Sequence, residues 1–393
     1  MDSQNSSRSC KNLFIAVVLI TGFSAIFYMY YEPSVNWLNC PVAPKHDDDC
    51  RNICINALNR TNQIQIVNDN CSVNFTSVQH QLTQTEAASS QGDDLDTIIL
   101  VWMWPFGQQF DLGLCSSMYD IHGCHLTVDK SQFNKAHGVL IHHRDIHGDL
   151  SNMPKLPRPP FQKWVWMNME SPTHTARHSN LNNLFNLTSS YRLDSDILVP
   201  YGRILENTGG KKDYEIPRKN KLVCWIVSNW NPNFRRSKFY GEFEKHISVQ
   251  TYGNHFNKRI GDQDYTDVMS SCKFYLSFEN SIHKDYITEK LYRPLSLGTV
   301  PVVIGPPRAN YEEFIPASAF IHVDDFKTPK ELADHLKLLD QNDNLYRQHF
   351  TWREHFFAKG GSFGLEHACY SCDHIRRNKN YRVVNDLNSW FWG

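Results

Sequence analysis

The sequence has no large excess of charge of either sign: 40 Lys and Arg residues stand against 41 Asp and Glu residues in a chain of 393. This balance argues against a surface whose main partner is nucleic acid or another polyanion, because such a surface needs a clear excess of positive charge. A repeat with a period of about 20–50 residues is also absent, which excludes a solenoid or a propeller. The length is instead enough for two medium-sized domains.

Charged residues are also absent from residues 13–31, LFIAVVLITGFSAIFYMYY, and this run is long enough to span a bilayer as a helix. Arg8 and Lys11 precede it, so the positive-inside rule keeps residues 1–12 in the cytoplasm. A cleaved signal peptide is the alternative, but no small-x-small cleavage site follows the run. We therefore expect an uncleaved single-pass type II anchor with the rest of the chain in the lumen.

Cysteine is not scarce: the chain has eleven, and with Cys10 on the cytoplasmic side an even number remains in the lumen, which indicates disulfides. Residues 32–95 are rich in Asn, Asp, Gln and Ser and are predicted to form a luminal stem. The stem holds four cysteines, which either cross-link it locally or join two chains into a homodimer: Cys40, Cys50, Cys54 and Cys71. N-glycosylation is expected at four N-x-S/T sequons: Asn59, Asn70, Asn74 and Asn186.

Two series of apolar, β-branched runs predict two parallel α/β sheets. The first series covers residues 96–108, 138–145 and 163–171. A Gly-Lys-Pro linker near residue 210 separates it from a second series at 221–229, 272–280, 298–305 and 319–326. The predicted fold class is therefore α/β, with two Rossmann-like domains at 96–212 and 213–360 that face each other across a cleft.

Polar residues follow two strands of the second series, where ligands bind in open α/β sheets. Ser228-Asn229 ends one strand and Glu279-Asn280 ends the next. The segment DYITEKLYRPLSLG (285–298) then predicts a helix that ends at Gly298 and carries Lys290 near its N-terminus. A lysine at the positive end of a helix dipole suits a phosphate group. A solvated Glu-Lys pair is the commoner alternative, but it does not explain the polar residues crowded beside it.

These motifs resemble those of the α1,3-fucosyltransferases of glycosyltransferase family 10. The resemblance rests on residues 272–316, CKFYLSFENSIHKDYITEKLYRPLSLGTVPVVIGPPRANYEEFIP, and on WPFGQ, HHRD, WMNMESPTHT, VSNWNP and HACYSCDH, which together extend it over residues 96–393. Within the family, the chain is most similar to the Lewis-x-forming 4-galactosyl-N-acetylglucosaminide 3-α-L-fucosyltransferases. The resemblance implies a GT-B fold, GDP-β-L-fucose as donor, inversion to an α-linkage, and a place in the Golgi membrane.

Inverting transfer requires a general base that deprotonates the acceptor hydroxyl. Glu170 ends the aromatic strand of residues 163–171, and burial there would raise its pKa toward a useful range. The base glutamate of the family matches this position. Without the resemblance, an exposed loop glutamate would be the simpler interpretation.

The resemblance also implies the donor-binding residues. Arg236 matches the pyrophosphate arginine, although the adjacent Arg235 leaves the register open. Lys290 is its partner cation, and Glu289 accepts hydrogen bonds from the fucose or ribose. The remaining matches are expected to line the donor site: Tyr201, Ser228, Asn229, Tyr275, Asn280 and Tyr286, the last of which is equally well explained as a packing residue.

In the family, the HHRD segment faces the acceptor, which implies roles for His143, Arg144 and Asp145. Arg144 resembles the form that prefers type 2 chains, Galβ1,4GlcNAc, carried by glycoproteins or glycolipids. Gln108 in WPFGQ is a second acceptor candidate.

The sequence contains only weak patterns of possible metal ligands. Asp-x-Asp triplets occur at 94–96, 194–196 and 262–264, but none follows a clear apolar strand. Four histidines at 137, 142, 143 and 147 lack Cys or carboxylate partners in zinc-ligand register. We expect no required cofactor and no metal site, and leave open a stimulation by divalent cations.

The CYSC segment (369–372) lies near the C-terminus rather than at the helix start of a thioredoxin-like unit. The expected disulfides are Cys115–Cys369, Cys124–Cys372 and Cys224–Cys272; the first two would return residues 361–393 to the first domain. Two other functions stay open. The first is a sugar-binding lectin of the same fold, which would not need the base. The second is fucosylation of the core GlcNAc of N-glycans; family members with this activity usually carry a Cys where this chain has Trp230.

Overall fold

The structure is a computed structural model that describes residues 96–393. The predicted cytoplasmic tail, anchor and stem lie outside these residues, together with Asn59, Asn70, Asn74 and the stem cysteines. Within residues 96–393, no helix is long and apolar enough to cross a membrane.

The first sheet has six parallel strands in the order β2-β1-β3-β4-β5-β6. Its strands are β1 (Thr97–Val101), β2 (Cys124–Thr127), β3 (Gly138–His142), β4 (Lys163–Asn168), β5 (Leu187–Ser190) and β6 (Ile197–Leu198). Strands β3 and β4 are buried at every position, because a parallel sheet is covered on both faces and its strands therefore read as continuous apolar runs.

The second sheet has five parallel strands in the order β12-β11-β10-β8-β9. They are β8 (Lys221–Ile226), β9 (Val249–Tyr252), β10 (Cys272–Phe278), β11 (Val300–Ile304) and β12 (Ile321–His322). The predicted α/β fold with parallel sheets is confirmed. The helices around this sheet are α5 (Arg235–Phe243), α6 (Asp262–Ser270), α7 (Glu289–Ser296), α8 (Arg308–Glu312), α9 (Pro329–Asp340) and α10 (Asp343–Gln348).

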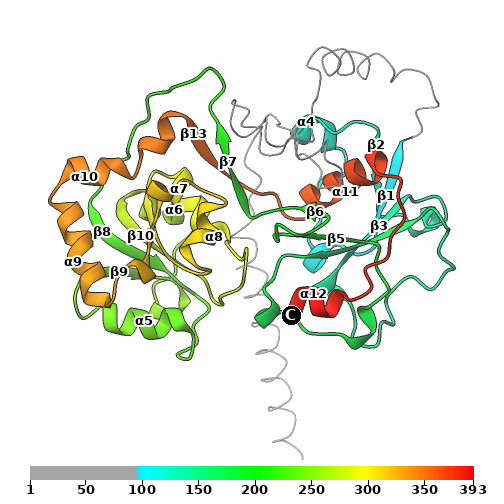
Figure 1. Cartoon of the computed structure of the whole chain (residues 1–393), viewed down its shortest axis with the longest axis horizontal. Coiled ribbons are helices and arrows are strands. Elements are labelled where there is room, and N and C mark those ends of the chain that lie inside the picture. The colour runs from blue at the N-terminus through cyan, green and yellow to red at the C-terminus, as the bar shows by residue number, and fades with distance from the viewer. Residues whose placement is uncertain (1–95) are drawn as a thin grey trace, which may run out of the picture.

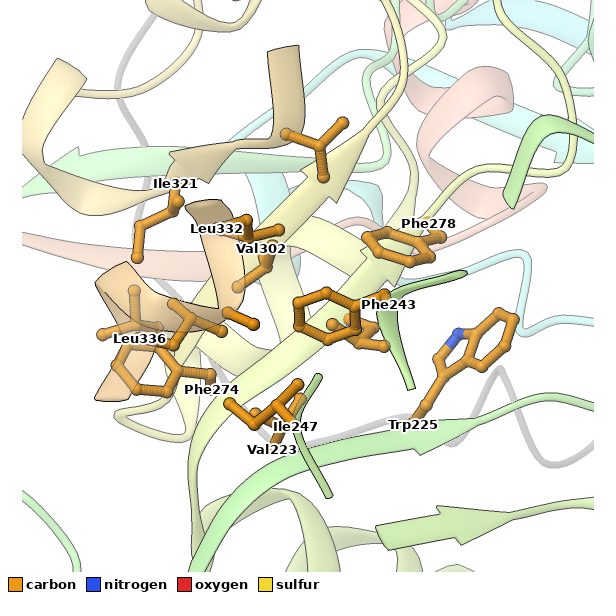
Figure 2. Close-up of a cluster of buried hydrophobic side chains, with 14 of the residues drawn as sticks. Val223, Trp225, Phe243, Ile247, Phe274, Phe278, Val302, Ile321, Leu332 and Leu336 are labelled. Carbon is orange, nitrogen blue, oxygen red and sulfur yellow. The ribbon is translucent and has the colours of Figure 1, made fainter. Parts of the chain in front are cut away.

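The core of the second sheet lies between its strands and helices α5 and α9. Figure 2 shows this cluster, in which Phe274 and Val302 of the sheet lie with Phe243 of α5 and Leu332 and Leu336 of α9. All five side chains are wholly buried. Burial of such side chains fixes the carboxyl ends of β8 and β10, where the polar rim residues follow.

The two sheets form separate lobes, and the chain returns from the second to the first near its end (Figure 1). Strand β13 (Phe356–Gly360) pairs antiparallel with β7 (Gly202–Glu206) between the lobes. Helix α11 (Leu365–Arg377) then packs on β1, β2 and β3, and α12 (Leu387–Trp392) also lies in the first lobe.

Three disulfides are present in residues 96–393, and they are the three pairs expected from the sequence. Cys369 and Cys372 of α11 join Cys115 of α4 (Cys115–Tyr119) and Cys124 of β2. The third bond, Cys224–Cys272, links β8 to β10. The first two close loops of 254 and 248 residues and hold the C-terminal segment on the first sheet.

The predicted helix of residues 285–298 is shorter in the structure. Asp285 has a positive φ of 63°, and Thr288 caps the helix, so α7 begins only at Glu289. Gly298 follows its last turn with φ 68°, as predicted for a residue after a helix. A Cβ at this position would lie 2.8 Å from Pro217, which is a second reason for glycine.

The predicted glycosylation of Asn186 is contradicted by its burial. The side chain is inaccessible to solvent, and its Nδ2 donates a hydrogen bond of 2.7 Å to the Arg382 carbonyl. Its Oδ1 accepts from Arg158 and from the backbone N–H of Trp164. A glycan on Nδ2 would have to displace the C-terminal segment. Asn186 is therefore a core residue and not a glycosylation site.

Candidate active site

Glu170 lies two residues beyond β4, in a turn that the Asn168 side chain closes by hydrogen bonds to the backbone. Asn168 is fully buried; its Oδ1 accepts from the Glu170 backbone N–H at 3.3 Å, and its Nδ2 donates to the Glu170 carbonyl at 3.2 Å. The Tyr201 hydroxyl donates to the neighbouring Met169 carbonyl. The backbone on both sides of Glu170 is therefore fixed, while 29% of its side chain stays exposed.

Charges from both lobes act on Glu170. Burial raises the pKa of its carboxyl above the ordinary value, whereas Arg144 and Lys290 oppose the rise and Glu289 adds to it. Arg144 Nη1 lies 4.0 Å from Glu170 Oε1. A carboxyl with a raised pKa, beside cations that keep it ionisable, has the properties of a general base.

Lys290 is enclosed by carboxylates at the start of α7. Its Nζ lies 3.0 Å from Glu289 Oε1, 3.3 Å from Glu279 Oε2 and 2.9 Å from Thr288 Oγ1. Glu279 is 3% exposed and also accepts hydrogen bonds from the N–H and hydroxyl of Thr288. Burial alone would raise the pKa of Glu289, but Lys290 lowers it below its ordinary value, so Glu289 is ionised.

The structure distinguishes the two adjacent arginines at the start of α5. Arg236 is buried and donates to the backbone carbonyls of Phe278 and Asn229, at the ends of β10 and β8. Arg235 points outward and forms an ion pair with Asp324. The buried cation next to both strand ends is therefore Arg236.

The other predicted donor residues lie around the same strand ends. Ser228 Oγ accepts from the Asn254 N–H at 3.3 Å, and Asn280 follows β10. The Tyr275 ring is buried within β10, but its hydroxyl reaches the Ile226 carbonyl at the end of β8, at 3.5 Å.

Tyr286 is 3% exposed and packs edge-on against Tyr191 and Tyr201, with ring centroids 5.2 and 6.1 Å away. This position matches the packing interpretation of Tyr286. Tyr201 is held by the same contact and by its bond to Met169, so it supports the Glu170 loop.

Two of the acceptor candidates form a connected unit with the WPFGQ loop. Asp145 Oδ2 accepts from the Phe106 N–H at 2.9 Å and contacts His142 Nδ1 at 2.7 Å. Phe106 has a positive φ of 52°, so this bond stabilises an unfavourable backbone conformation. The Arg144 guanidinium lies over the Phe106 ring at 5.6 Å, and the partly exposed Gln108 follows in the same loop.

His143 is buried and both of its ring nitrogens have protein partners, which corrects its predicted role as an acceptor-binding residue. It is 1% exposed; Nδ1 accepts from the Trp166 indole at 3.0 Å, and Nε2 contacts the Ala176 carbonyl at 2.7 Å. Burial lowers the pKa of the imidazole to about 4, so the ring is neutral and structural.

Side-chain hydrogen bonds hold the Glu170 loop against the loop after β10. Ser281 Oγ donates to Ser171 Oγ at 2.7 Å, and Thr173 Oγ1 lies 2.6 Å from His283 Nε2. These contacts join residues that are 110 positions apart, and they explain why the electrostatic fields of α7 reach Glu170.

Sequence reasoning missed the supporting residues Glu279, Thr288 and Asn168. The sequence predicts Glu279 only as a rim residue, whereas Thr288 fits the residue type of a helix cap. The turn that Asn168 closes is also local, because it bonds to Glu170 two residues on, and Asn is common in such turns. Among residues 96–393 no group of three or more His, Cys, Asp or Glu side chains could hold a metal ion.

Comparisons with known proteins identify the family. Residues 94–202 match the family "Fucosyltransferase, N-terminal", and residues 216–390 match "Glycosyltransferase family 10 (fucosyltransferase) C-term". The chain is 54% identical over 305 residues to 4-galactosyl-N-acetylglucosaminide 3-alpha-L-fucosyltransferase 9 of Bos taurus, covering 78% of this chain and 85% of that protein. The Homo sapiens protein of the same name is 56% identical over 297 residues, covering 76% and 82%.

A second relative, 3-galactosyl-N-acetylglucosaminide 4-alpha-L-fucosyltransferase FUT3 of Bos taurus, is 41% identical over 312 residues, covering 78% of this chain and 85% of that protein. Among solved structures, an alpha1,3-fucosyltransferase with GDP-fucose is similar at 19% identity and a TM-score of 0.48, covering 76% of this chain and 94% of that one.

The two family matches define the chain as a glycosyltransferase, an enzyme that transfers a sugar. The chain belongs to glycosyltransferase family 10, the fucosyltransferases. The predicted family and enzyme class are thereby confirmed.

Proposed function

We propose that the protein transfers L-fucose from GDP-β-L-fucose to O3 of GlcNAc in Galβ1,4GlcNAc termini, with inversion, to give a Lewis x type product. The names of the relatives at 54–56% identity support this acceptor and linkage. We further propose that the two lobes act as the acceptor and donor domains of a GT-B enzyme, anchored in the Golgi membrane with the catalytic part in the lumen.

The observation that carries the proposal is that the Glu170 loop lies against the loop that leads from β10 to α7, where Ser171 hydrogen-bonds to Ser281 and Thr173 to His283. Lys290 and Glu289 both act on the pKa of Glu170, although they follow a different sheet. A base on one lobe and a cation on the other is the arrangement that an inverting transfer between a nucleotide sugar and an acceptor requires.

In this mechanism Glu170 removes the proton from O3 of GlcNAc as that oxygen attacks C1 of fucose. The bond between C1 and the β-phosphate oxygen breaks, and its electron pair stays on the diphosphate. Arg236 and Lys290 neutralise the charge that develops there. Two protein cations can take the part of a metal, so we propose that no cofactor is required.

Acceptor choice depends on the unit formed by Arg144, Asp145 and Phe106. Arg144 is 38% exposed in its side chain and lies next to Glu170, where a planar fork of donors can bind sugar hydroxyls. Asp145 holds the Phe106 loop, and Phe106 presents an apolar ring beneath Arg144.

A panel of acceptors with linkage analysis of the products tests the proposal. We expect GDP-fucose with N-acetyllactosamine to give an α1,3-linked product on GlcNAc. Transfer to the core GlcNAc of N-glycans instead would support the first alternative, and sugar binding without GDP release would support a lectin. Product on both glycoprotein and glycolipid carriers would show that the carrier does not decide specificity.

A further inference from the structure

His174 lies where the Glu170 loop meets the donor side of the second sheet. It ends a short 3-10 helix, Pro172–His174, four residues after Glu170. Its carbonyl accepts a hydrogen bond of 3.0 Å from Arg144 Nη1. Its ring lies edge-on to Phe234, the N-cap residue of α5, with centroids 5.7 Å apart.

The two ring nitrogens of His174 differ in their surroundings. The backbone carbonyl of Asn280, at the end of β10, acts on the ring as a hydrogen-bond acceptor. Nε2 is buried and has no hydrogen-bond partner among residues 96–393. Because nearly all buried polar atoms in proteins are paired, an unpaired nitrogen at the meeting point of two lobes needs an explanation.

Positive groups from several elements surround this ring. Burial lowers the pKa of His174 below its ordinary value, and Arg236 of α5, Arg144 of the HHRD segment and Lys290 of α7 lower it further, against the Asn280 carbonyl. His283, on the loop after β10, also interacts electrostatically with the His174 ring. The imidazole is therefore neutral in the free enzyme at neutral pH, within a cluster of cations.

We propose that His174 is a further donor-binding residue, which takes up a proton on Nε2 and donates a hydrogen bond to the diphosphate of the nucleotide. The inference rests on the proposed function, since it names the diphosphate as the ligand. The proton comes from solvent when the nucleotide binds, stays on Nε2 while the fucosyl bond breaks, and returns to solvent when GDP leaves. The proton from the acceptor goes separately to Glu170.

The charge of the ligand supplies the driving force. A diphosphate placed among Arg236, Lys290 and His174 compensates the cations that hold the pKa of the imidazole down, so the pKa is higher in the complex than in the free enzyme. Linkage then requires that GDP binds more tightly as the pH falls through the pKa of the complex, until the pKa of the free enzyme is reached.

Calorimetric titration with GDP tests this at pH 6.5, in two buffers of different ionisation enthalpy, with wild type and His174→Gln. The difference between the two enthalpies gives the number of protons taken up on binding. Gln can place an amide donor near the Nε2 position but cannot titrate. We expect proton uptake to be lower in the variant than in wild type, and GDP affinity to fall by about 10- to 100-fold, as for a lost charge-assisted hydrogen bond.

Two controls separate binding from structure. His125 is exposed on the edge strand β2, and His125→Gln should match wild type in affinity and proton uptake. Titration with guanosine, which lacks phosphate, should give the same affinity in wild type and His174→Gln.

Equal proton uptake in wild type and His174→Gln would overturn the inference, and so would an equal loss of affinity for guanosine and GDP, which would mark a structural role. If wild type itself did not bind GDP, the proposed function would fail instead. The two failures are therefore distinguishable.

Discussion

Replacement of Glu170 by glutamine should stop transfer while the donor still binds. Gln has nearly the same volume, and the hydrogen bonds that fix residue 170 come from Asn168 to its backbone, so the fold should persist. The neutral amide cannot take the proton from the acceptor hydroxyl. General bases contribute about 10²- to 10⁴-fold, so kcat should fall by that factor, equivalent to about 2.7–5.4 kcal/mol in the barrier.

The affinity for the donor nucleotide should not fall in Glu170→Gln. Glu170 is negatively charged when it acts as a base, and it lies within the field of Lys290 and Arg144. Its removal takes away a repulsion of the diphosphate, so the Kd for GDP should stay equal or decrease. The rate of GDP release from GDP-fucose with N-acetyllactosamine, together with GDP titration, measures both quantities. Glu313→Gln, at an exposed position after α8, serves as the matched control.

The pH profile gives an independent test of the same residue. Because burial raises the pKa of Glu170, kcat should rise with pH as this carboxyl loses its proton, and Glu170→Gln should lose that limb. Arg144 lowers the pKa of Glu170, so Arg144→Met should move the limb to higher pH. Near-wild-type turnover in Glu170→Gln, or an unchanged limb, would refute the assignment of the base.

Three further outcomes are expected. Activity should survive EDTA at a reduced level at most, because protein cations neutralise the diphosphate; complete and reversible loss would show that a metal ion is required. Arg144→Trp should weaken transfer to Galβ1,4GlcNAc relative to Galβ1,3GlcNAc by about 1–3 kcal/mol without changing the KM for GDP-fucose, and an unchanged ratio would remove Arg144 from the acceptor site. Asn186→Gln should destabilise the fold by about 2–4 kcal/mol in thermal or denaturant unfolding, and mass analysis of wild type should find Asn186 without a glycan.

Local sequence patterns determined the elements and the chemistry at their ends. Continuous apolar runs predicted the strands, because a parallel sheet buries both faces, and the polar residues after β8 and β10 followed from where those runs stop. Gly298 predicted the end of α7, because its positive φ is a property of a few residues of chain. The motif order was specific enough to give the family. The positions of six cysteines along the chain gave the three disulfide pairs.

Tertiary structure decided which side chains are accessible. Adjacent arginines look alike in sequence, but one helical step turns Arg236 into the lobe and Arg235 toward Asp324. A sequon is read from three residues, whereas the burial of Asn186 depends on Arg382, which is 196 positions away.

The same reason applies to His143, Glu279 and His174. The partners of the two histidines come from another strand or from the other lobe: Trp166 for His143, and the Asn280 carbonyl for His174. Those of Glu279 lie nine or more residues further along the chain, in Thr288 and Lys290. No local pattern encodes such contacts, because they exist only once the two sheets have formed and Ser171 and Thr173 have met Ser281 and His283 across them.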